Sequence, residues 1–463
     1  MGANTDELKL PNLGETSTSI FSSEKEYQLG RAWLRIFRSR APTSDDPLLV
    51  DYLENLIYRL ATHSQLEDRR LDIVVVRNQT LNAFAVPGGV IGVHDGLLAY
   101  AQSEDELATV LAHELAHLSQ RHFSRGIEQQ KRQTPLALAG MLAGLLLIAT
   151  TGSDAGMAAI TASQAASRQS QLRFSRGNEQ EADRIGMLTM VSAGMDPHAA
   201  PAMFERMLKA TRYNSHNVPE FLLSHPISEN RISDTRNRAR RYTKTMGTEN
   251  IEYHLMRTRV RVLQEKSPHI AIQRFRTALS GDTLFPEAER YGLVLALTES
   301  RQLNLAREAL EPLLATNPES ITYIVAEAEI NIADGRSKMA VKKLSEKLRL
   351  APNNYPLSMI YAEALLKSRQ AHIAEEVLVS LSKSRPNSPS VWYQLAETQG
   401  LAGNISGLHR SRAEYYILNG IIDKANQQLQ YALKLTKNNF AEAETIKQRL
   451  IDIEVIKNMM EKL

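Results

Sequence analysis

The sequence predicts a two-part fold: an α+β domain that is mostly helical with a small sheet, followed by an all-α solenoid of short repeats. The chain has 463 residues, which is too long for one compact core of usual size. Strand-like runs are confined to Leu71–Leu98, and from about residue 254 alanine-rich helical segments take over. We therefore expect a flexible tail over 1–22, a first domain over 23–250 and a repeat domain over 254–463.

Composition excludes several classes of function. The chain carries 55 basic and 52 acidic residues and no Lys/Arg tract, so nothing indicates a nucleic-acid partner and we expect none. It has no cysteine, which excludes disulfides and thiolate metal sites. The polar start "MGANTDELKLPNLGETSTS" lacks the basic and apolar parts of a signal peptide.

Apolar runs are short throughout the chain. No run reaches the ~18 residues that a membrane-spanning helix needs, so we expect no such helix. The longest candidate is Leu136–Ala149, "LALAGMLAGLLLIA". Core packing and contact with a membrane or substrate are both open readings of this segment.

Two helices are predicted before the first strand. Ser23 followed by Glu26 has the spacing of a capping box and predicts a helix to about Arg38. Asp46 and Pro47 are typical of the start of a second helix, whose apolar residues then follow at helical spacing.

The small sheet is predicted from the next segment. Leu71–Asn78, "LDIVVVRN", is rich in β-branched residues and is bounded by charge, which predicts a strand. Asn82–Leu98 predicts two short strands interrupted by Pro87–Gly89. Ser103 and Glu106 then form a second capping box, and a helix follows.

The second part of the chain contains an internal repeat of 34 residues. Several independent positions recur with this step: Pro318, Pro352 and Pro386; Ala306, Ala340 and Ala374; Leu310, Leu344 and Leu378; Ala328, Ala362 and Ala396. A period of 34 residues in helical sequence is typical of tetratricopeptide repeats. Small residues let paired helices approach closely, and the proline ends the second helix of a unit. The alternative is a non-repetitive helical bundle.

The helix after Ser103 contains the stretch "ATVLAHELAHLSQRH", in which His113–His117 fits the pattern H-E-x-x-H. Residues four apart lie on one face of an α-helix, so both imidazoles can reach one zinc ion. Glu114 can act as a general base toward a water that attacks a carbonyl. The alternative is a half-buried helix with satisfied histidines. His122 is nine residues after His113, on the opposite face of a continuous helix, and is expected to be a surface or packing histidine.

A third metal ligand is predicted in "NEQEADRIG". Glu179 and Asp183 are four apart and share a helical face. Glu179 would complete a His, His, Glu site with an open position for water, and Asp183 would orient one imidazole through its other nitrogen. Glu181 faces nearly away and is not expected to be a ligand. The alternative for Glu179 is an ordinary solvated charge.

Two further candidates lie in "LLSHPISENRI". Pro226 disfavours helical geometry at His225, which places this histidine on a loop or a helix edge. There it could assist catalysis at the oxyanion, coordinate the metal as a fourth ligand that closes the site, or be structural. Arg231 could pair with a carboxylate or stabilise the transition state, and an ordinary salt bridge is an equal alternative.

Together the motifs HELAH, NEQEAD, SHP…R and NAFAVPGG resemble those of the CAAX prenyl endopeptidase/HtpX family of zinc metallopeptidases, over residues 82 to 231. The resemblance implies a zincin-like metallopeptidase domain with one Zn²⁺ per chain. It implies that His113, His117 and Glu179 are the zinc ligands and that Glu114 is the general base. It also implies that Asp183 supports a ligand and that His225 is a regulatory fourth ligand.

The resemblance also implies a substrate cleft at residues 82–89, where an edge strand could pair with an extended peptide. The candidate substrate-binding residues there are Asn82, Phe84, Gly88 and Gly89.

A soluble family member fused to tetratricopeptide repeats resembles periplasmic proteases and chaperones of Gram-negative outer-membrane assembly. This resemblance implies a periplasmic location and unfolded or misassembled outer-membrane proteins as substrates. It also implies contact with the assembly machinery through the repeats. The apolar run Leu136–Ala149 is a candidate for peripheral membrane contact. The competing function is a repeat-based assembly chaperone or adaptor with a latent protease site, because nothing in such repeats is catalytic. A purely structural zinc site is a third alternative.

Overall fold

The computed structural model describes residues 22–129, 146, 176–213, 220–244, 249–436 and 439–461. The described part is mostly helical and contains one three-stranded sheet, as the sequence predicts for the first domain. Its N-terminal elements are α1 (Ser23–Arg38), α2 (Pro47–Thr62), β1 (Asp72–Val76), β2 (Ala83–Val86), β3 (Val90–His94), α3 (Asp95–Tyr100), α4 (Glu104–Ser119) and α5 (His122–Gln129). Four helices follow: α9 (Arg176–Ser192), α10 (Ala199–Tyr213), α11 (Glu220–Ser224) and α12 (Glu229–Ala239).

Helix starts follow the capping rules with one shift. The α1 helix is capped by Ser22, whose side chain accepts from the Lys25 amide, so the cap lies one residue before the predicted Ser23. At α4 the predicted pair operates: Ser103 Oγ accepts from the Glu106 amide, and the Glu106 carboxylate accepts from the Gln102 amide. These caps fix where the helix that carries the HELAH motif begins.

The sheet has the order β1-β3-β2, with β1 parallel and β2 antiparallel to β3. The β2–β3 turn contains Gly88 and Gly89, whose φ angles are 84° and 80°, a left-handed region that favours glycine. A Cβ at Gly88 would collide with the backbone of Glu26 in α1. The turn therefore packs closely against α1, and β2 forms an edge of the described sheet.

One aromatic cluster joins α1 to the sheet. Trp33 stacks on Phe37 with ring centroids 5.0 Å apart, and Phe84 of β2 meets both rings edge-on at 5.7 and 5.6 Å. Leu146, the only described residue of the apolar run Leu136–Ala149, is buried in the same cluster. The rest of that run lies outside the described residues.

Helix α4 is the central helix of the first domain. It packs against α9, α2, α10 and β2, so nearly all of its length from Glu106 to His117 is buried. Gly186 of α9 faces Ala112 of α4, where an added Cβ would lie 3.1 Å from the Ala112 carbonyl carbon. This close approach brings the polar residues of α4 and α9 together.

The second part of the chain is a succession of paired helices: α13 (Ile251–Leu263), α14 (Pro268–Ser280), α15 (Pro286–Glu299), α16 (Leu303–Thr316), α17 (Ile321–Ala333), α18 (Ser337–Leu350), α19 (Tyr355–Lys367), α20 (Ala371–Ser384), α21 (Pro389–Leu401), α22 (Ile405–Leu418), α23 (Ile422–Leu435) and α24 (Phe440–Met460). Helices α16, α18, α20 and α22 start at 303, 337, 371 and 405, each 34 residues after the last. The repeated alanines and leucines of this part, such as Ala340 and Leu344, are buried between neighbouring helices.

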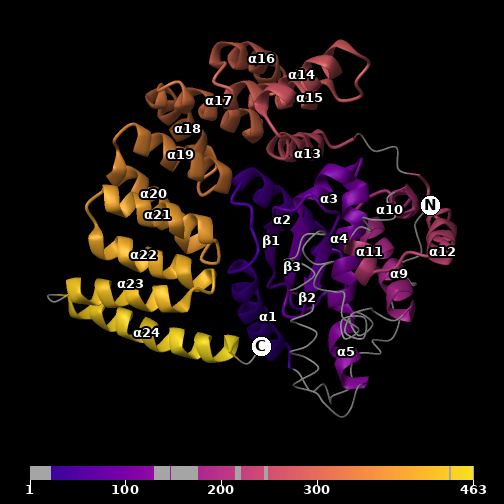
Figure 1. Cartoon of the computed structure of the whole chain (residues 1–463), viewed down its shortest axis with the longest axis horizontal. Helices are drawn as coiled ribbons and strands as arrows, with labels where there is room; N and C mark the ends of the chain where they lie inside the picture. The colour runs from indigo at the N-terminus through magenta and orange to yellow at the C-terminus, as the bar shows by residue number, and fades with distance from the viewer. Residues whose placement is uncertain are drawn as a thin grey trace.

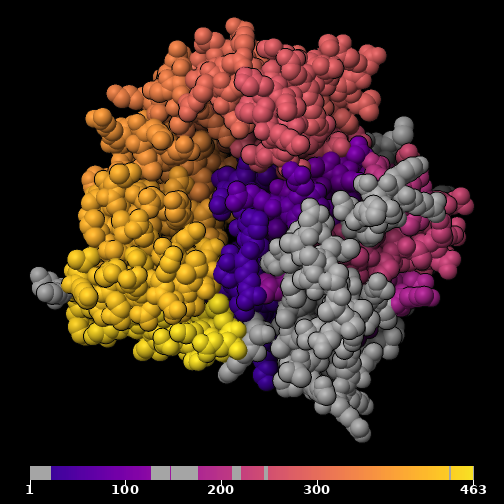
Figure 2. Space-filling model, viewed as in Figure 1, coloured from indigo at the N-terminus to yellow at the C-terminus, as the bar shows by residue number. Residues whose placement is uncertain are grey.

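We call α13–α24 the helical array. It curves along one side of the N-terminal elements in Figure 1, and α24 ends beside α1. In the space-filling view its orange and yellow helices form a continuous body against the indigo surface of α1 and α2 (Figure 2). Among the described residues, no helix has both the length and the apolar character needed to cross a membrane.

The array is tied to the first domain by charged contacts. Arg259 of α13 donates to Asp46, the N-cap of α2, at 2.6 Å and to Glu329 of α17 at 2.8 Å. Arg385, which follows α20, pairs with Glu54 of α2 at 2.7 Å. These contacts hold the array in a defined position relative to the helix α2 that packs on α4.

Candidate metal centre and active site

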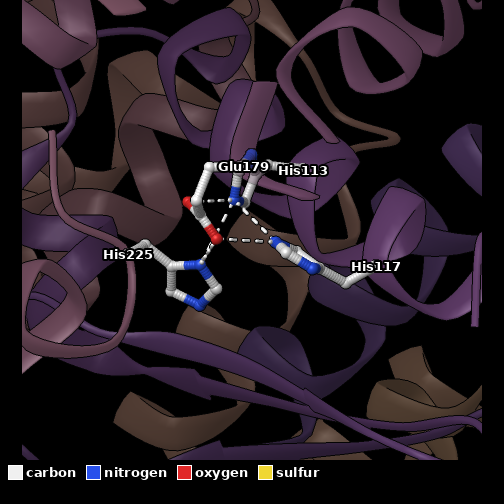
Figure 3. A group of neighbouring side chains, drawn as sticks. All are labelled: His113, His117, Glu179 and His225. Carbon is white, nitrogen blue, oxygen red and sulfur yellow. Dashed lines mark hydrogen bonds and ion pairs between the residues drawn. The ribbon is translucent and has the colours of Figure 1, made fainter. Parts of the chain in front are cut away.

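Four potential metal donors from three elements converge in the interior (Figure 3). His113 and His117 come from α4, Glu179 from the first turn of α9, and His225 directly follows α11. His113 Nε2 lies 3.0 Å from His117 Nε2 and 3.3 Å from His225 Nδ1. Glu179 Oε1 lies 3.0 Å from His225 Nδ1 and 3.4 Å from His117 Nε2. The structure thus brings together all four residues that the sequence singled out as ligands.

This donor set fits a zinc ion. Tetrahedral zinc with bonds of ~2.0–2.1 Å to nitrogen and oxygen places its ligand atoms about 3.3 Å apart. Four of the pairs among these side chains lie 3.0–3.4 Å apart, and all of the ligand atoms lie within 4.8 Å of one another. Three ring nitrogens face one another in an almost fully buried site, an arrangement that a shared cation stabilises. Although burial opposes ionisation, His225, His113 and His117 hold the pKa of Glu179 well below its usual range. Glu179 is therefore available as an anionic ligand.

A second set of charged groups supports the donors. Asp183 Oδ1 lies 3.0 Å from His113 Nδ1, the nitrogen that faces away from the donor cluster. Arg231 binds both carboxylate oxygens of Asp183 at 2.7 Å and lies 2.7 Å from Glu179 Oε2. Burial alone would raise the pKa of Asp183, but His113 and Arg231 lower it below its ordinary value. The position of Asp183 is the one that an imidazole-orienting carboxylate needs, and Arg231 pairs with both carboxylates.

His122 was expected to be a surface or packing histidine on the face opposite His113, and the structure instead buries it beside His117. Helix α4 ends at Ser119, so His122 begins α5 and turns back into the interior, where it is 1% exposed. Its Nδ1 lies 2.8 Å from His117 Nδ1, and its Nε2 lies 2.9 Å from Glu181 Oε2. Burial lowers the pKa of His122, so a neutral ring can accept from His117 and donate to Glu181. Each of the two α4 imidazoles thus has a polar partner on its outer nitrogen.

Glu114 lies between the donor cluster and the edge strand β2. Its carboxyl accepts a hydrogen bond from the backbone amide of Ala85 in β2, and its Oε1 lies 3.5 Å from His225 Nε2. Burial raises the pKa of this carboxyl above its ordinary value, while His225 and His113 oppose that shift. A carboxyl placed beside a metal donor set and facing a sheet edge is suited to proton transfer at that edge.

His225 is held in place by the short helix α11. Its amide donates to the Phe221 carbonyl at 2.8 Å, and its ring stacks on the Phe221 ring with centroids 4.7 Å apart and an angle of 25°. Pro226 follows it, and His225 lies directly after the last residue of α11, at the predicted helix edge. His225 therefore presents one nitrogen to the donors and the other to Glu114.

The residues predicted to bind substrate are buried or lie in a tight turn. Asn82 is 1% exposed and donates to Glu220 Oε2 at 3.3 Å, while Phe84 belongs to the buried aromatic cluster with Trp33. Gly88 and Gly89 form the turn that packs on α1. The side chains of Asn82 and Phe84 thus point into the interior, and their contact with substrate stays a prediction, as does peptide contact with the backbone of β2. A strand pattern alone does not show which face is covered by a neighbouring helix.

The α4–α9 pair, the small sheet and the donor set define a metallopeptidase. A model of peptidase family M48 matches residues 47–239. The β-barrel assembly-enhancing protease of Escherichia coli (strain K12) is 32% identical over 429 residues, which cover 92% of this chain and 88% of the relative. The protein of that name from Yersinia pestis is 32% identical over 417 residues, 90% of this chain and 85% of the relative.

A further relative matches a shorter part of the chain. The mitochondrial metalloendopeptidase OMA1 of Schizosaccharomyces pombe is 33% identical over 189 residues, 39% of this chain and 50% of the relative. The chain belongs to peptidase family M48, and it is a zinc-dependent metallopeptidase. This confirms the resemblance drawn from the HELAH, NEQEAD and SHP motifs.

Proposed function

We propose that the chain is a periplasmic endopeptidase that degrades misfolded or stalled outer-membrane proteins and assists their assembly. The observation that carries the proposal is the buried donor cluster of His113, His117, Glu179 and His225 beside Glu114 and the edge strand β2. Support for the substrate class comes from relatives named β-barrel assembly-enhancing proteases, which align with this chain over 92% and 90% of its length.

In this proposal His113, His117 and Glu179 hold the zinc. When bound, zinc supplies a Lewis acid that activates water and polarises the scissile carbonyl. Glu114 takes a proton from the attacking water as the water oxygen bonds to the carbonyl carbon. The same carboxyl then delivers the proton to the amine nitrogen as the C–N bond breaks. Asp183 orients His113, and Arg231 fixes the positions of the Asp183 and Glu179 carboxylates by pairing with both.

Substrate would bind as an extended strand along β2. The outer edge of β2 faces Glu114, because the Ala85 amide donates to that carboxyl. A peptide that pairs with this edge would lie beside the proton-transfer group, with its backbone rather than its side chains recognised. This mode suits unfolded segments of many sequences.

The helical array is proposed to be a tetratricopeptide repeat domain that binds substrate or the assembly machinery. Its 34-residue recurrence of helix starts and the buried small residues between paired helices support this assignment. Peripheral membrane contact near Leu136–Ala149 also stays a proposal, on its apolar sequence alone.

The test of the enzymatic proposal is Glu114→Gln. The amide keeps the size of the side chain but cannot take a proton, so cleavage of unfolded casein should fall ~100-fold or more. Zinc content, measured by atomic absorption, should remain at one ion per chain because Glu114 is not among the donors. Undiminished cleavage by a pure sample of this variant would contradict the assignment.

A second candidate function has its own support. His225 fills a fourth donor position, and four protein ligands would close the site to water, so the resting protein could act mainly as an assembly chaperone or adaptor. If Glu114→Gln still supports outer-membrane assembly while removal of the residues after about 254 does not, binding is the main role. Loss of assembly with Glu114→Gln would favour proteolysis.

A further inference from the structure

A second buried polar cluster lies next to the metal donors but shares no residue with them. It contains Thr80 and Asn82 from the loop before β2, His94 at the end of β3 and Glu220 at the start of α11. Asn82 Nδ2 donates to Glu220 Oε2 at 3.3 Å, and Thr80 Oγ1 lies 3.0 Å from His94 Nδ1. His94 Nδ1 lies 3.9 Å from Glu220 Oε2. The cluster therefore joins the sheet to α11.

Within the described residues, three polar atoms of this cluster are buried without a hydrogen-bond partner: Asn82 Oδ1, Glu220 Oε1 and His94 Nε2. The first two are both acceptors if Glu220 is ionised, so neither can satisfy the other. One proton on Glu220 changes this, because the acid O–H can turn toward Asn82 Oδ1 while the Asn82 amide keeps donating to Oε2. A carboxylic acid and a primary amide then form a paired double hydrogen bond, and two buried acceptors gain a partner.

The surroundings favour the protonated form. Burial raises the pKa of Glu220 to about 7, although the hydrogen bonds from Thr80 and Asn82 oppose the shift. Burial also lowers the pKa of His94, which faces Glu220 from β3, to about 4, so this ring is neutral. Neither the loop from Asn78 to Asn82 nor α11 contains a Lys or Arg.

Two ionisable groups of α4 lie along α11, one against the residue that follows Glu220 and one near the far end of the helix. His113 lies against Phe221, with ring centroids 6.1 Å apart, and Glu114 lies near His225. Among the described residues, no arginine or lysine forms an ion pair with Glu220 that would stabilise its ionised form.

The helix α11 connects this cluster to the metal donors. It is a single turn of five residues, with Glu220 at its first position. Phe221 donates its amide to the Leu81 carbonyl at 3.3 Å, accepts from the His225 amide and stacks on the His225 ring. Whatever fixes Glu220 against Asn82 therefore also fixes the position of His225.

We propose that Glu220 and Asn82 form a proton-dependent clasp that docks α11 and thereby positions His225 in the metal donor set. Its consequence for activity rests on the proposed role of His225 as a fourth ligand. With Glu220 protonated, the clasp is closed and His225 stays with the donors. With Glu220 ionised, Asn82 Oδ1 and Glu220 Oε1 repel each other, α11 undocks more often and His225 leaves the donor set.

The raised pKa of Glu220 determines how the docking of α11 depends on pH. The pKa of Glu220 in the docked state is higher than the pKa of an exposed glutamate. Docking is therefore strongest at a pH at which Glu220 is protonated whether α11 is docked or undocked. The contribution of protonated Glu220 to the docking of α11 is fully present below the ordinary glutamate pKa of 4.5, and it is lost as the pH rises toward and through about 7. The clasp is thus tighter in acid and looser in base, and cleavage should rise as it loosens.

The clasp itself is tested by hydrogen exchange of the peptide covering 220–225 in the zinc-loaded full-length protein. Between pH 6 and pH 8, after correction for intrinsic exchange, wild-type protection should fall about tenfold, as linkage to a group with a pKa of about 7 requires. Glu220→Gln can pair with Asn82 at any pH, so its protection should not change with pH. The exposed Glu67→Gln removes a carboxyl elsewhere and should behave as wild type.

A second variant covers the case in which Glu220→Gln fails to fold. Asn82→Ala removes the amide partner, so α11 should exchange rapidly at both pH values. The clasp would be overturned if Asn82→Ala or Glu220→Gln showed the same tenfold fall in protection between pH 6 and pH 8 as the wild type. Equal protection of the wild type at pH 6 and pH 8 would also overturn it.

X-ray absorption at the zinc edge separates the clasp from the role of His225. At pH 6 the wild-type spectrum should fit three imidazoles, and at pH 8 a mixture nearer two, while Glu220→Gln should keep three at both. If His225→Ala has as many imidazoles as wild type at pH 6, His225 is not a ligand and that part of the proposed function fails. The exchange experiment still decides whether the clasp exists.

Discussion

His225 is the residue that most affects whether this site can work. Its Nδ1 lies 3.0 Å from Glu179 and 3.3 Å from His113, and its Nε2 lies 3.5 Å from Glu114. A ring in this position can complete the zinc donors and occupy the place that water needs. The same contacts would suit a ring that moves aside to assist the oxyanion.

Replacement of this side chain distinguishes the two roles. We expect His225→Ala to raise cleavage of unfolded casein severalfold at pH 7, because three protein ligands leave a position for water. The exposed histidine variant His63→Ala should leave cleavage unchanged. If His225→Ala instead abolishes turnover while zinc is retained, His225 is a catalytic residue and the closing role is wrong.

Asp183 provides a second test at this scale. Asp183→Asn removes the charge beside His113 Nδ1 and leaves Arg231 with a weaker partner. Zinc affinity, measured by competition with a chelator, should fall ~10–100-fold, as is usual for such supporting groups. Glu181→Gln acts on His117 only through His122 and should have a smaller effect. Unchanged affinity in Asp183→Asn would show that His113 does not need this carboxylate.

At the scale of elements, the site depends on how α4, α9 and β2 meet. The close packing at Gly186 sets the distance between α4 and α9, and Phe84 anchors β2 to α1 through the aromatic cluster. Phe84 also lies across Gly92 of β3, where any larger residue would meet its ring. The position of the edge strand beside Glu114 therefore rests on buried aromatic packing.

Phe84 is expected to behave as a core residue. Phe84→Ala should lower the free energy of unfolding by ~3–5 kcal/mol, measured by urea denaturation, because a buried ring is lost and a cavity remains. Phe84→Leu keeps most of the volume and should cost less. Unchanged stability together with a raised KM for peptide would instead support the original prediction that Phe84 contacts substrate.

Local spacing explains which parts of the site the sequence could predict. The four-residue steps predict that His113 and His117 share one helix face and that Glu179 and Asp183 share another. The approach of the two helices is not contained in this spacing, and the family resemblance supplied it. His122 was misplaced because the end of α4 at Ser119 was not evident from periodicity. The burial of Asn82 could not be predicted, because its partner, Glu220, is 138 residues away and only the tertiary packing brings the two together.

At the scale of the whole molecule, the helical array and the first domain share buried charge. Arg259 has an 11% exposed side chain and connects the N-cap of α2 to α17 through Asp46 and Glu329. Burial opposes the charge, but these two carboxylates raise the pKa of Arg259 above its ordinary value. The array is thus coupled to α2, which packs on the catalytic helix.

Removal of this cation should be costly. Arg259→Ala leaves two carboxylates without their common partner and should reduce the free energy of unfolding by ~3–5 kcal/mol. Arg412→Ala breaks an exposed pair with Glu397 inside the array and should cost no more than ~1 kcal/mol. Equal effects of the two substitutions in urea denaturation would show that the contact between the array and the first domain contributes little.

We propose that His113, His117 and Glu179 hold one catalytic zinc with His225 as a fourth donor. Anomalous X-ray diffraction from crystals of the zinc-loaded protein, collected above and below the zinc edge, tests it most directly. We expect one zinc peak about 2.0–2.2 Å from His113 Nε2, His117 Nε2, a Glu179 oxygen and His225 Nδ1. A zinc peak elsewhere, or a fully active protein with no zinc between these side chains, would contradict the account.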